Sequence, residues 1–308
     1  MGAFADYFAE HRPELLVVLG DRYEIYGACS AAAMLGIPIA HLHGGETTEG
    51  AVDEFLRHAI TKMSTLHFTA CKEYRRRVIQ LGECPERVFD VGALGVENLL
   101  RIPAMTLCEL QESLNFTLEG KPFTVVTFHP VTMESGTAEA QLRELICAMD
   151  EFPDMRYIVT LANADAGGRI INQIWQEEEK SHPNWLVIPS LGAKRYLSAL
   201  RYAEMMLGNS SSGILEAPAA HNPTVNIGDR QKGRMMAESV LCCEPVREEI
   251  VAAMRKALSS EHQMVARQTI CPFGDGNTSE KTLKILLRFL NTSEKNNKKS
   301  FYDLSFEV

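Results

Sequence analysis

The sequence lacks the features that mark membrane, secreted and nucleic-acid-binding proteins. No apolar run approaches the ~20 residues of a membrane span, and no charged start with an apolar core marks a signal peptide. Acidic residues outnumber basic ones, 40 against 31, and the net charge of −9 argues against a nucleic-acid surface, although a nucleotide needs only a local cluster of cations. The eight cysteines include no CxxC pair, which is typical of a reduced protein with free thiols. We therefore expect a cytoplasmic protein without membrane or nucleic-acid partners.

The 308 residues do contain a regular alternation of apolar runs and helical patterns. The apolar runs of the first part are 14–19, 37–43, 66–69 and 87–91. After a less regular stretch between Ile102 and Pro122, the alternation resumes with an apolar run at 123–128. Such alternation predicts an α/β fold of two doubly wound, Rossmann-like lobes with parallel sheets and a central cleft. We expect a first lobe over 1–115, a second lobe over 116–290, and a loose polar tail over 291–308.

Polar residues follow two apolar runs of the first lobe, at the carboxyl ends where ligands of open α/β sheets bind. Asp21 comes directly after the first run, a position where an aspartate also commonly caps the following helix. The second run ends in His-Leu-His-Gly-Gly-Glu, which contains His41, His43 and Glu46. The period of a strand places the two histidines on one face, and the two glycines let the backbone approach a ligand closely.

Four more titratable residues stand near the start of the next predicted helix: Asp53, Glu54, Arg57 and His58. Asp53 and Arg57 share one helix face at i,i+4, as do Glu54 and His58. A His-x-His pair with nearby carboxylates can hold zinc. This spacing is not a specific ligand signature, however, and no Cys/His cluster supports it. We expect polar ligand contacts or catalysis here, and no metal.

The stretch 207–218, Leu-Gly-Asn-Ser-Ser-Ser-Gly-Ile-Leu-Glu-Ala-Pro, has the composition of a phosphate site in the second lobe. Gly208 and Asn209 turn the chain, and the three serines supply N-cap hydroxyls for a helix that begins near Gly213. A helix start offers N–H groups and a positive dipole end to a phosphate. Glu216 follows one turn later, where it can accept hydrogen bonds from a ribose. The alternative for this stretch alone is a serine-capped helix without a ligand.

The loop 226–234 adds three cations, Arg230, Lys232 and Arg234, after the next predicted strand. By itself such a loop is a solvated basic segment. Together with the serine stretch it favours a pyrophosphate site at the carboxyl ends of the strands. Two further strand ends of this lobe are polar, one with His129 and one with Asn163 and Asp165.

Taken together, these motifs resemble the hydrolysing UDP-N-acetylglucosamine 2-epimerases of bacterial sialic-acid synthesis and of the animal bifunctional enzyme. The resemblance runs from about residue 14 to 290 and rests on the set of motifs, since each alone is weak. It implies the two-lobed glycosyltransferase-B fold and release of UDP and N-acetylmannosamine from UDP-N-acetylglucosamine, without an external cofactor. It is also compatible with a homodimer. The family's first strand and arginine-bearing turn have no counterpart before Phe4, so we expect an incomplete first lobe that lacks about two βα units.

The resemblance also implies roles for individual residues. Asp21 and Asp53 match carboxylates of the acid–base step, and His129 matches a histidine at the substrate phosphates. Relatives carry a catalytic glutamate where this chain has His43, so either His43 takes the proton or Glu46 or Glu54 supplies the carboxylate. The catalytic candidates are Asp21, His43, Glu46, Asp53, Glu54 and His129. The expected UDP-sugar-binding residues are Arg22, Asn163, Asp165, Asn209, Ser210, Ser211, Glu216, Arg230, Gln231 and Arg234.

Three other functions stay open on the sequence. The His-x-His pair also resembles enzymes that act on UDP-diacetamido-trideoxy sugars of the legionaminic acid route. A glycosyltransferase of the same fold is disfavoured by the cluster of acids, because transfer to an acceptor needs at most one base. A chain without its first units would be a catalytically impaired UDP-sugar binder.

Overall fold

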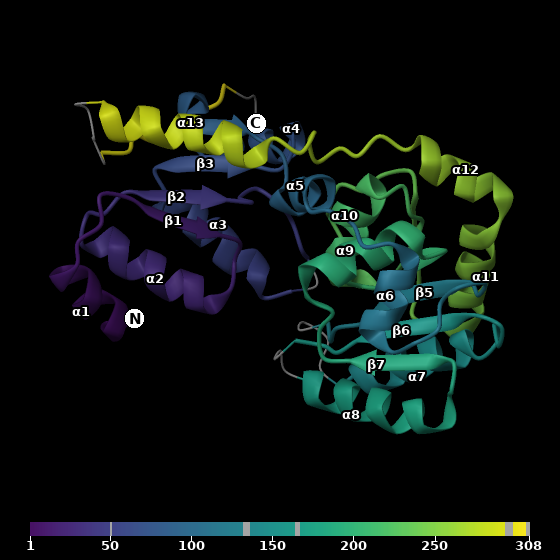
Figure 1. Ribbon diagram of the computed structural model, residues 1–308. Helices are drawn as coiled ribbons and strands as arrows, with labels where there is room; N and C mark the ends of the chain where they lie inside the picture. Colours follow the sequence, from purple (N-terminus) through teal and green to yellow (C-terminus); the bar gives the residue numbers. More distant parts are fainter. Residues whose placement is uncertain (50, 132–135, 164–166, 293–297, 306–308) are drawn as a thin grey trace. The chain divides into compact units, whose positions relative to one another are not determined.

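The structure, a computed structural model, describes residues 1–49, 51–131, 136–163, 167–292 and 298–305 (Figure 1). The chain forms two compact units. Unit 1 comprises residues 1–48, 52–97 and 272–308, and unit 2 comprises residues 49–51 and 98–271. No helix in these described ranges is both long and apolar enough to cross a membrane.

Unit 1 is built on a four-stranded parallel sheet in the order β1-β2-β3-β4. Its strands are β1 (Leu16–Leu19), β2 (Ile39–Leu42), β3 (Leu66–Thr69) and β4 (Val88–Asp90). Its helices are α1 (Gly2–Glu10), α2 (Tyr23–Met34), α3 (Asp53–Met63), α4 (Lys72–Gln80), the start of α5 (Leu94–Arg101), and α13 (Thr278–Asn291), with a 3-10 turn η1 (Pro85–Arg87). Because the strands lie in chain order, the described sheet has no point at which the order reverses.

Alternate residues of β2 enter two separate apolar layers of unit 1. Ile39 packs with residues of α1, α2 and α3, whereas Ala40 and Leu42 pack with β3 and α13. A continuous apolar run such as 14–19 predicts a strand buried on both faces, but β1 is buried on one face only. Val17 and Leu19 of β1 are 50% and 51% exposed, because β1 is an edge strand and these two side chains lie outside the layer that α13 covers.

Unit 2 is built on a six-stranded parallel sheet in the order β10-β9-β8-β5-β6-β7. Its strands are β5 (Phe123–Thr127), β6 (Arg156–Thr160), β7 (Trp185–Ile188), β8 (Met205–Gly208), β9 (Thr224–Ile227) and β10 (Val240–Cys243). The chain enters at β5, runs outward through β6 and β7, and returns to β8 on the other side of β5. The order therefore reverses between β5 and β8, the place where α/β sheets bind ligands beyond their carboxyl ends.

Helices cover both faces of the unit 2 sheet. They are α6 (Leu107–Leu114), α7 (Ala138–Met149), α8 (Gly168–Glu178), α9 (Gly192–Tyr202), α10 (Ser212–Ala219), α11 (Arg247–Leu258) and α12 (Ser260–Gln268), with 3-10 turns η2 (Glu179–Ser181) and η3 (Asp229–Gln231). Val126 faces the layer that contains Trp175 and Ile250, while Val125 faces the layer that contains Leu110 and Leu200. The doubly wound arrangement predicted for the second lobe is confirmed.

The two units differ from the predicted division of the chain at both ends. Leu110 and Leu114 of α6 belong to a core of unit 2, although residues up to 115 were assigned to the first lobe. Conversely α13 was assigned to the second lobe, but it packs in unit 1, where the amide of Ser279 donates to Glu97 Oε2 at 2.6 Å. The helical periodicity of α13 predicts a helix without indicating which sheet it covers.

The tail predicted to be loose makes contacts with unit 1 in its described part. Lys299 Nζ lies 2.6 Å from Glu83 Oε2, and the amide of Tyr302 donates to the carbonyl of Gly82 at 3.0 Å. The ammonium of Lys62 lies 5.0 Å from the centre of the Phe301 ring. Burial alone would raise the pKa of Glu83, but hydrogen bonds from His67, Lys299 and Lys62 lower it to about 2. The buried carboxylate of Glu83 thus holds the polar segment around Lys299 against unit 1.

Candidate active site

The centre of the candidate site in unit 1 is a guanidinium that is 1% exposed, that of Arg57 on α3. Its Nε donates to Asp21 Oδ2 at 2.8 Å, and its Nη2 also contacts this carboxylate. Its Nη1 donates to Glu54 Oε2 and to the carbonyl of Glu46, both at 2.9 Å, and its Nη2 donates to Thr48 Oγ1 at 2.9 Å. A buried cation is stable only when its charge and donors are paired in this way.

The charges around Arg57 shift its own pKa and that of its partner. Burial alone would lower the pKa of Arg57, but the nearby carboxylates of Asp21, Glu46 and Glu54 raise it above its ordinary value. Burial alone would raise the pKa of Glu54, but hydrogen bonds from His58 and from the amide of Thr48, together with Arg57, lower it to about 2. The cluster therefore holds an ionised Glu54 over the whole neutral range.

Arg57 was not among the predicted site residues. Its spacing from Asp53 was the available signal, but the guanidinium donates to Glu54, one position later, and to Asp21, 36 residues away. The predicted pairing of Glu54 with His58 is present at 2.9 Å. Asp21 was also considered as a helix cap, yet the residue at the cap position of α2 is Arg22. The predicted Asp21, Glu46 and Glu54 thus come together around Arg57, which was named from the sequence but not included among the candidate site residues.

A second feature of this site is a histidine–carboxylate pair, His43 with Glu46. His43 Nδ1 lies 2.8 Å from Glu46 Oε1, and the Glu46 side chain is almost fully buried. An ionised Glu46 accepts this hydrogen bond, so Nδ1 carries the proton and Nε2 is left as a base. Gly45 makes the tight turn possible, because a Cβ there would lie 2.4 Å from the carbonyl oxygen of Tyr74 and its φ is +79°.

The two histidines of the His-x-His motif do not share a strand face, so that prediction is wrong. β2 ends at Leu42, and His43 lies in the left-handed region with φ of 66°. His41 is fully buried, and its Nε2 donates to the carbonyl of Gly20 at 2.9 Å. Burial lowers its pKa to about 3, so the ring is neutral. His41 therefore fixes the turn that leads into Asp21.

Two predicted residues of unit 1 lie at helix starts. Asp53 is the first residue of α3 and is partly buried. Arg22 precedes α2, where its Nε lies 3.9 Å from Glu24 Oε2 and its guanidinium lies 5.8 Å from the centre of the Tyr23 ring.

The candidate site in unit 2 is a cavity of about 380 Å³ at the point where the strand order reverses. Predicted residues His129, Ser210 and Glu216 line it, together with Tyr196. Ser210 Oγ accepts a hydrogen bond from the amide of Ser212, the first residue of α10, at 3.3 Å, while Ser211 makes no capping bond with its side chain. The start of a helix therefore stands beside a cavity whose wall carries hydroxyl groups, a histidine and a carboxyl.

Four predicted UDP-binding residues make contacts within the protein and are not among the residues that line this cavity. The carboxamide of Asn209, which is fully buried, pairs with the backbone of His129. Gln231 Nε2 donates to the carbonyl of Asn209 at 2.8 Å, and Arg230 Nη1 reaches the same oxygen at 3.4 Å. The amide of Asn163 donates to His129 Nδ1 at 3.3 Å. Arg234 is partly buried in the loop after η3, and Asp165 lies outside the described residues.

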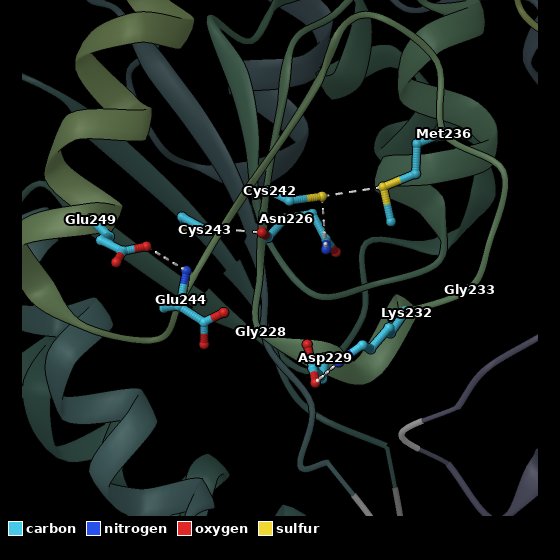
Figure 2. Close-up of a pocket in the computed structure, with 10 residues that line it drawn as sticks. All are labelled: Asn226, Gly228, Asp229, Lys232, Gly233, Met236, Cys242, Cys243, Glu244 and Glu249. Atoms are coloured by element: carbon cyan, nitrogen blue, oxygen red, sulfur yellow. Dashed lines mark hydrogen bonds and ion pairs between the residues drawn. The ribbon is translucent and has the colours of Figure 1, made fainter.

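A second cavity of unit 2, of about 320 Å³, lies on the side of β9 and β10 (Figure 2). Asp229 and Lys232 line it and pair at 2.8 Å, and Cys242 Sγ lies 3.3 Å from Met236 Sδ. The sequence groups Lys232 with the cations of the predicted pyrophosphate site. In the structure it lines this second cavity and not the one lined by Ser210 and Glu216.

The chain is similar to known proteins over most of its length. The family model described as UDP-N-acetylglucosamine 2-epimerase matches residues 1–287. The chain is 37% identical over 305 residues to the polysialic acid biosynthesis protein P7 of Escherichia coli, covering 99% of this chain and 77% of that protein. It is 39% identical over 244 residues to the GDP/UDP-N,N'-diacetylbacillosamine 2-epimerase (hydrolyzing) of Campylobacter jejuni, covering 79% of this chain and 63% of that protein.

Among solved structures, the UDP-GlcNAc 2-epimerase of Neisseria meningitidis, crystallised with UDP-GlcNAc, superposes with a TM-score of 0.79 at 16% identity. The match covers 93% of this chain and 80% of that one. At this identity the likeness is evidence of fold, and it confirms the predicted α/β class with two parallel sheets.

Proposed function

This chain belongs to the UDP-N-acetylglucosamine 2-epimerase family, and from that premise we propose that it is a hydrolysing 2-epimerase acting on a UDP-activated amino sugar. The observation that carries the proposal is the cluster around Arg57, where Asp21, Glu54 and the His43–Glu46 pair meet in one buried network. Such a network supplies groups that take up and release protons, as epimerisation requires.

The proposed reaction has two balanced steps. A base removes the proton at sugar carbon 2, the C–H electrons form a double bond to carbon 1, and the bond from carbon 1 to the UDP oxygen breaks. Water then adds across the double bond, with its hydroxyl at carbon 1 and a proton at carbon 2 on the opposite configuration. The products are UDP and the 2-epimeric amino sugar.

In unit 1 we assign proton transfer to His43, Asp21 and Asp53. His43 takes the place of the family's glutamate because Glu46 holds its Nδ1 and leaves Nε2 as a base. Asp21 is kept in place by two donors from Arg57, so its position does not depend on the substrate. Each positioned proton-transfer group typically contributes about 10²–10⁴ in rate.

In unit 2 we assign UDP binding to the cavity at the strand reversal. The start of α10 and Ser210 suit the diphosphate, and Glu216, one turn into the helix, suits the ribose hydroxyls. His129 lines the same cavity and is assigned to the phosphate oxygens. Arg230, whose Nη1 contacts the carbonyl of Asn209, and Arg234 are proposed as the cations of the diphosphate site. This half of the proposal needs no lysine and no metal.

We propose UDP-N-acetylglucosamine as the substrate and N-acetylmannosamine as the product, for the synthesis of sialic acids. The second candidate is a UDP-diacetamido-trideoxy sugar. It is favoured by the 39% identity to the Campylobacter jejuni enzyme and by the 34% identity to the Legionella pneumophila UDP-N,N'-diacetylbacillosamine 2-epimerase.

The test is proton NMR of each sugar nucleotide with the purified protein in heavy water. We expect free UDP and the 2-epimeric sugar with deuterium at carbon 2, because the proton at this carbon comes from solvent. The nucleotide that turns over identifies the substrate. Release of UDP only with an added acceptor would contradict the proposal in favour of a glycosyltransferase, and UDP binding without turnover of either sugar would contradict it in favour of a silent binder.

A further inference from the structure

Asn209 is bound to the backbone of His129 at two points. Its Oδ1 accepts from the His129 amide at 2.7 Å, and its Nδ2 donates to the His129 carbonyl at 2.8 Å. Two hydrogen bonds to one residue restrain its rotation as well as its position. Asn209 is fully buried, so water does not compete for these bonds.

The main chain of Asn209 is also held from two directions. Its amide donates to the carbonyl of Thr127, the last residue of β5, at 3.1 Å. Its carbonyl accepts from the side chain of Gln231, which is 1% exposed, at 2.8 Å. Asn209 therefore joins the ends of β5 and β8 and the η3 turn, and His129 is attached to this junction.

The hydrogen bond to the ring of His129 determines which nitrogen carries the proton. The backbone amide of Asn163 points at His129 Nδ1 at 3.3 Å. A backbone amide can only donate, so Nδ1 is the acceptor and the neutral ring carries its proton on Nε2. His129 thus carries an N–H donor on its ring, and the residue lines the 380 Å³ cavity.

We infer that Asn209 is a positioning residue of the reaction, acting through His129 and not by contact with the nucleotide. This inference rests on the proposed function. The Nε2–H of His129 donates to the diphosphate as it leaves carbon 1, and fixed donors stabilise developing charge because they need no rearrangement. Loss of Asn209 leaves the start of α10 and Glu216 in place, so it lowers turnover more than it weakens UDP binding.

The experiment compares Asn209→Ala and Asn209→Asp with the wild type. The alanine variant loses both bonds to His129, while the aspartate variant keeps an acceptor for the amide and loses the donor. We expect kcat to fall about 10²-fold in Asn209→Ala and less in Asn209→Asp, while the Kd for UDP, from calorimetry, changes less than about threefold. A matched control is Asn222→Ala, because Asn222 is a similarly buried asparagine whose Nδ2 donates to the carbonyls of Leu200 and Ala203.

Nitrogen-15 NMR of the histidine rings gives a readout that a merely structural role would not move. We expect the Nε2–H tautomer for His129 in the wild type and a mixture of tautomers in Asn209→Ala, with no change in Asn222→Ala. An Nδ1–H ring in the wild type, or a Kd for UDP that rises as much as kcat falls, would overturn the inference. Because the tautomer and the Kd are measured without turnover, they judge the inference even if the proposed reaction is absent, and the wild-type spectrum does so even if both variants fail to fold.

Discussion

The two candidate sites are held together by different kinds of group, charged side chains in unit 1 and neutral amide and backbone groups in unit 2. In unit 1 the site is made of charged side chains: Arg57 is buried with Asp21 and Glu54, and His43 is paired with Glu46. In unit 2 the cavity is formed at a helix start, and its ordering bonds run through an amide, Asn209, and the backbone of His129. A network of ionisable groups suits proton transfer, whereas neutral donors and a helix dipole suit a bound diphosphate. The comparison predicts that the two functions can be damaged separately.

The largest effect is expected from Arg57→Met, which removes the shared partner of Asp21 and Glu54. Breaking a buried ion pair by loss of one member typically costs about 3–5 kcal/mol, because the remaining charges are left uncompensated. We expect a fall of this size in the free energy of unfolding, measured with urea, and loss of turnover. Arg57→Lys is the control, since it keeps the charge but not the fork of donors. An Arg57→Met protein with wild-type turnover would contradict the assignment of the site.

The next effect concerns catalysis alone. His43→Gln removes the base while leaving Glu46 and the Arg57 pairs in place, so kcat should fall by about 10²–10⁴. The Kd for UDP should stay the same, because the residues assigned to UDP lie in unit 2. Kinetic assays of UDP release measure kcat, and calorimetry measures the Kd for UDP. If Glu46→Gln abolishes turnover while His43→Gln does not, the carboxylate and not the histidine is the base.

The converse change acts on unit 2. Glu216→Gln removes a charged acceptor for the ribose hydroxyls, and a hydrogen bond to a charged group is worth about 1.5–3 kcal/mol. We therefore expect the Kd for UDP to rise about tenfold or more, while kcat at saturating substrate changes less. Uracil and phosphate alone should bind as before, which serves as the control. An unchanged Kd would show that Glu216 does not contact the nucleotide.

The smallest effect is a difference in acid stability between the units. Glu54 and Glu83 of unit 1 both have pKa values of about 2, below their ordinary value, so the stability they contribute is complete above pH ~4.5 and is lost as the pH falls toward 2. In unit 2 the pKa of Glu109 is also lowered, by bonds within the capping box that starts α6, but this carboxyl is exposed and contributes little.

This difference can be measured because both tryptophans of the chain, Trp175 and Trp185, lie in unit 2. On acidification from pH ~5 to ~2, helical circular dichroism should decrease before the tryptophan fluorescence changes. Glu83→Gln should weaken the pH dependence of unit 1 stability, because it removes one of the two carboxyls whose pKa is lowered. Glu83 is remote in sequence from the catalytic candidates. Coincident transitions by the two probes would contradict the prediction.

Much of the fold followed from the sequence because its causes are local. The alternation of apolar runs and helical patterns predicted parallel sheets, and the glycine-serine stretch predicted the helix start at α10, one residue from where the structure has it. His129, Ser210 and Glu216 were found as strand-end or helix-start residues, and all three line one cavity. Position in an α/β sheet is enough to place such residues, since carboxyl ends of parallel strands meet at one edge.

The sequence by itself determined the types of element, their order, the polar strand ends and the family to which the motifs belong. The tertiary structure alone decided the partners: that Arg57 reaches across 36 residues to Asp21, that α13 covers the unit 1 sheet, that Lys299 finds Glu83, and that Asn209 holds His129. The reason is physical. Backbone conformation responds to neighbours within a turn or a strand, whereas the partner of a buried charge or amide is whichever group the packing of distant segments brings within about 3 Å.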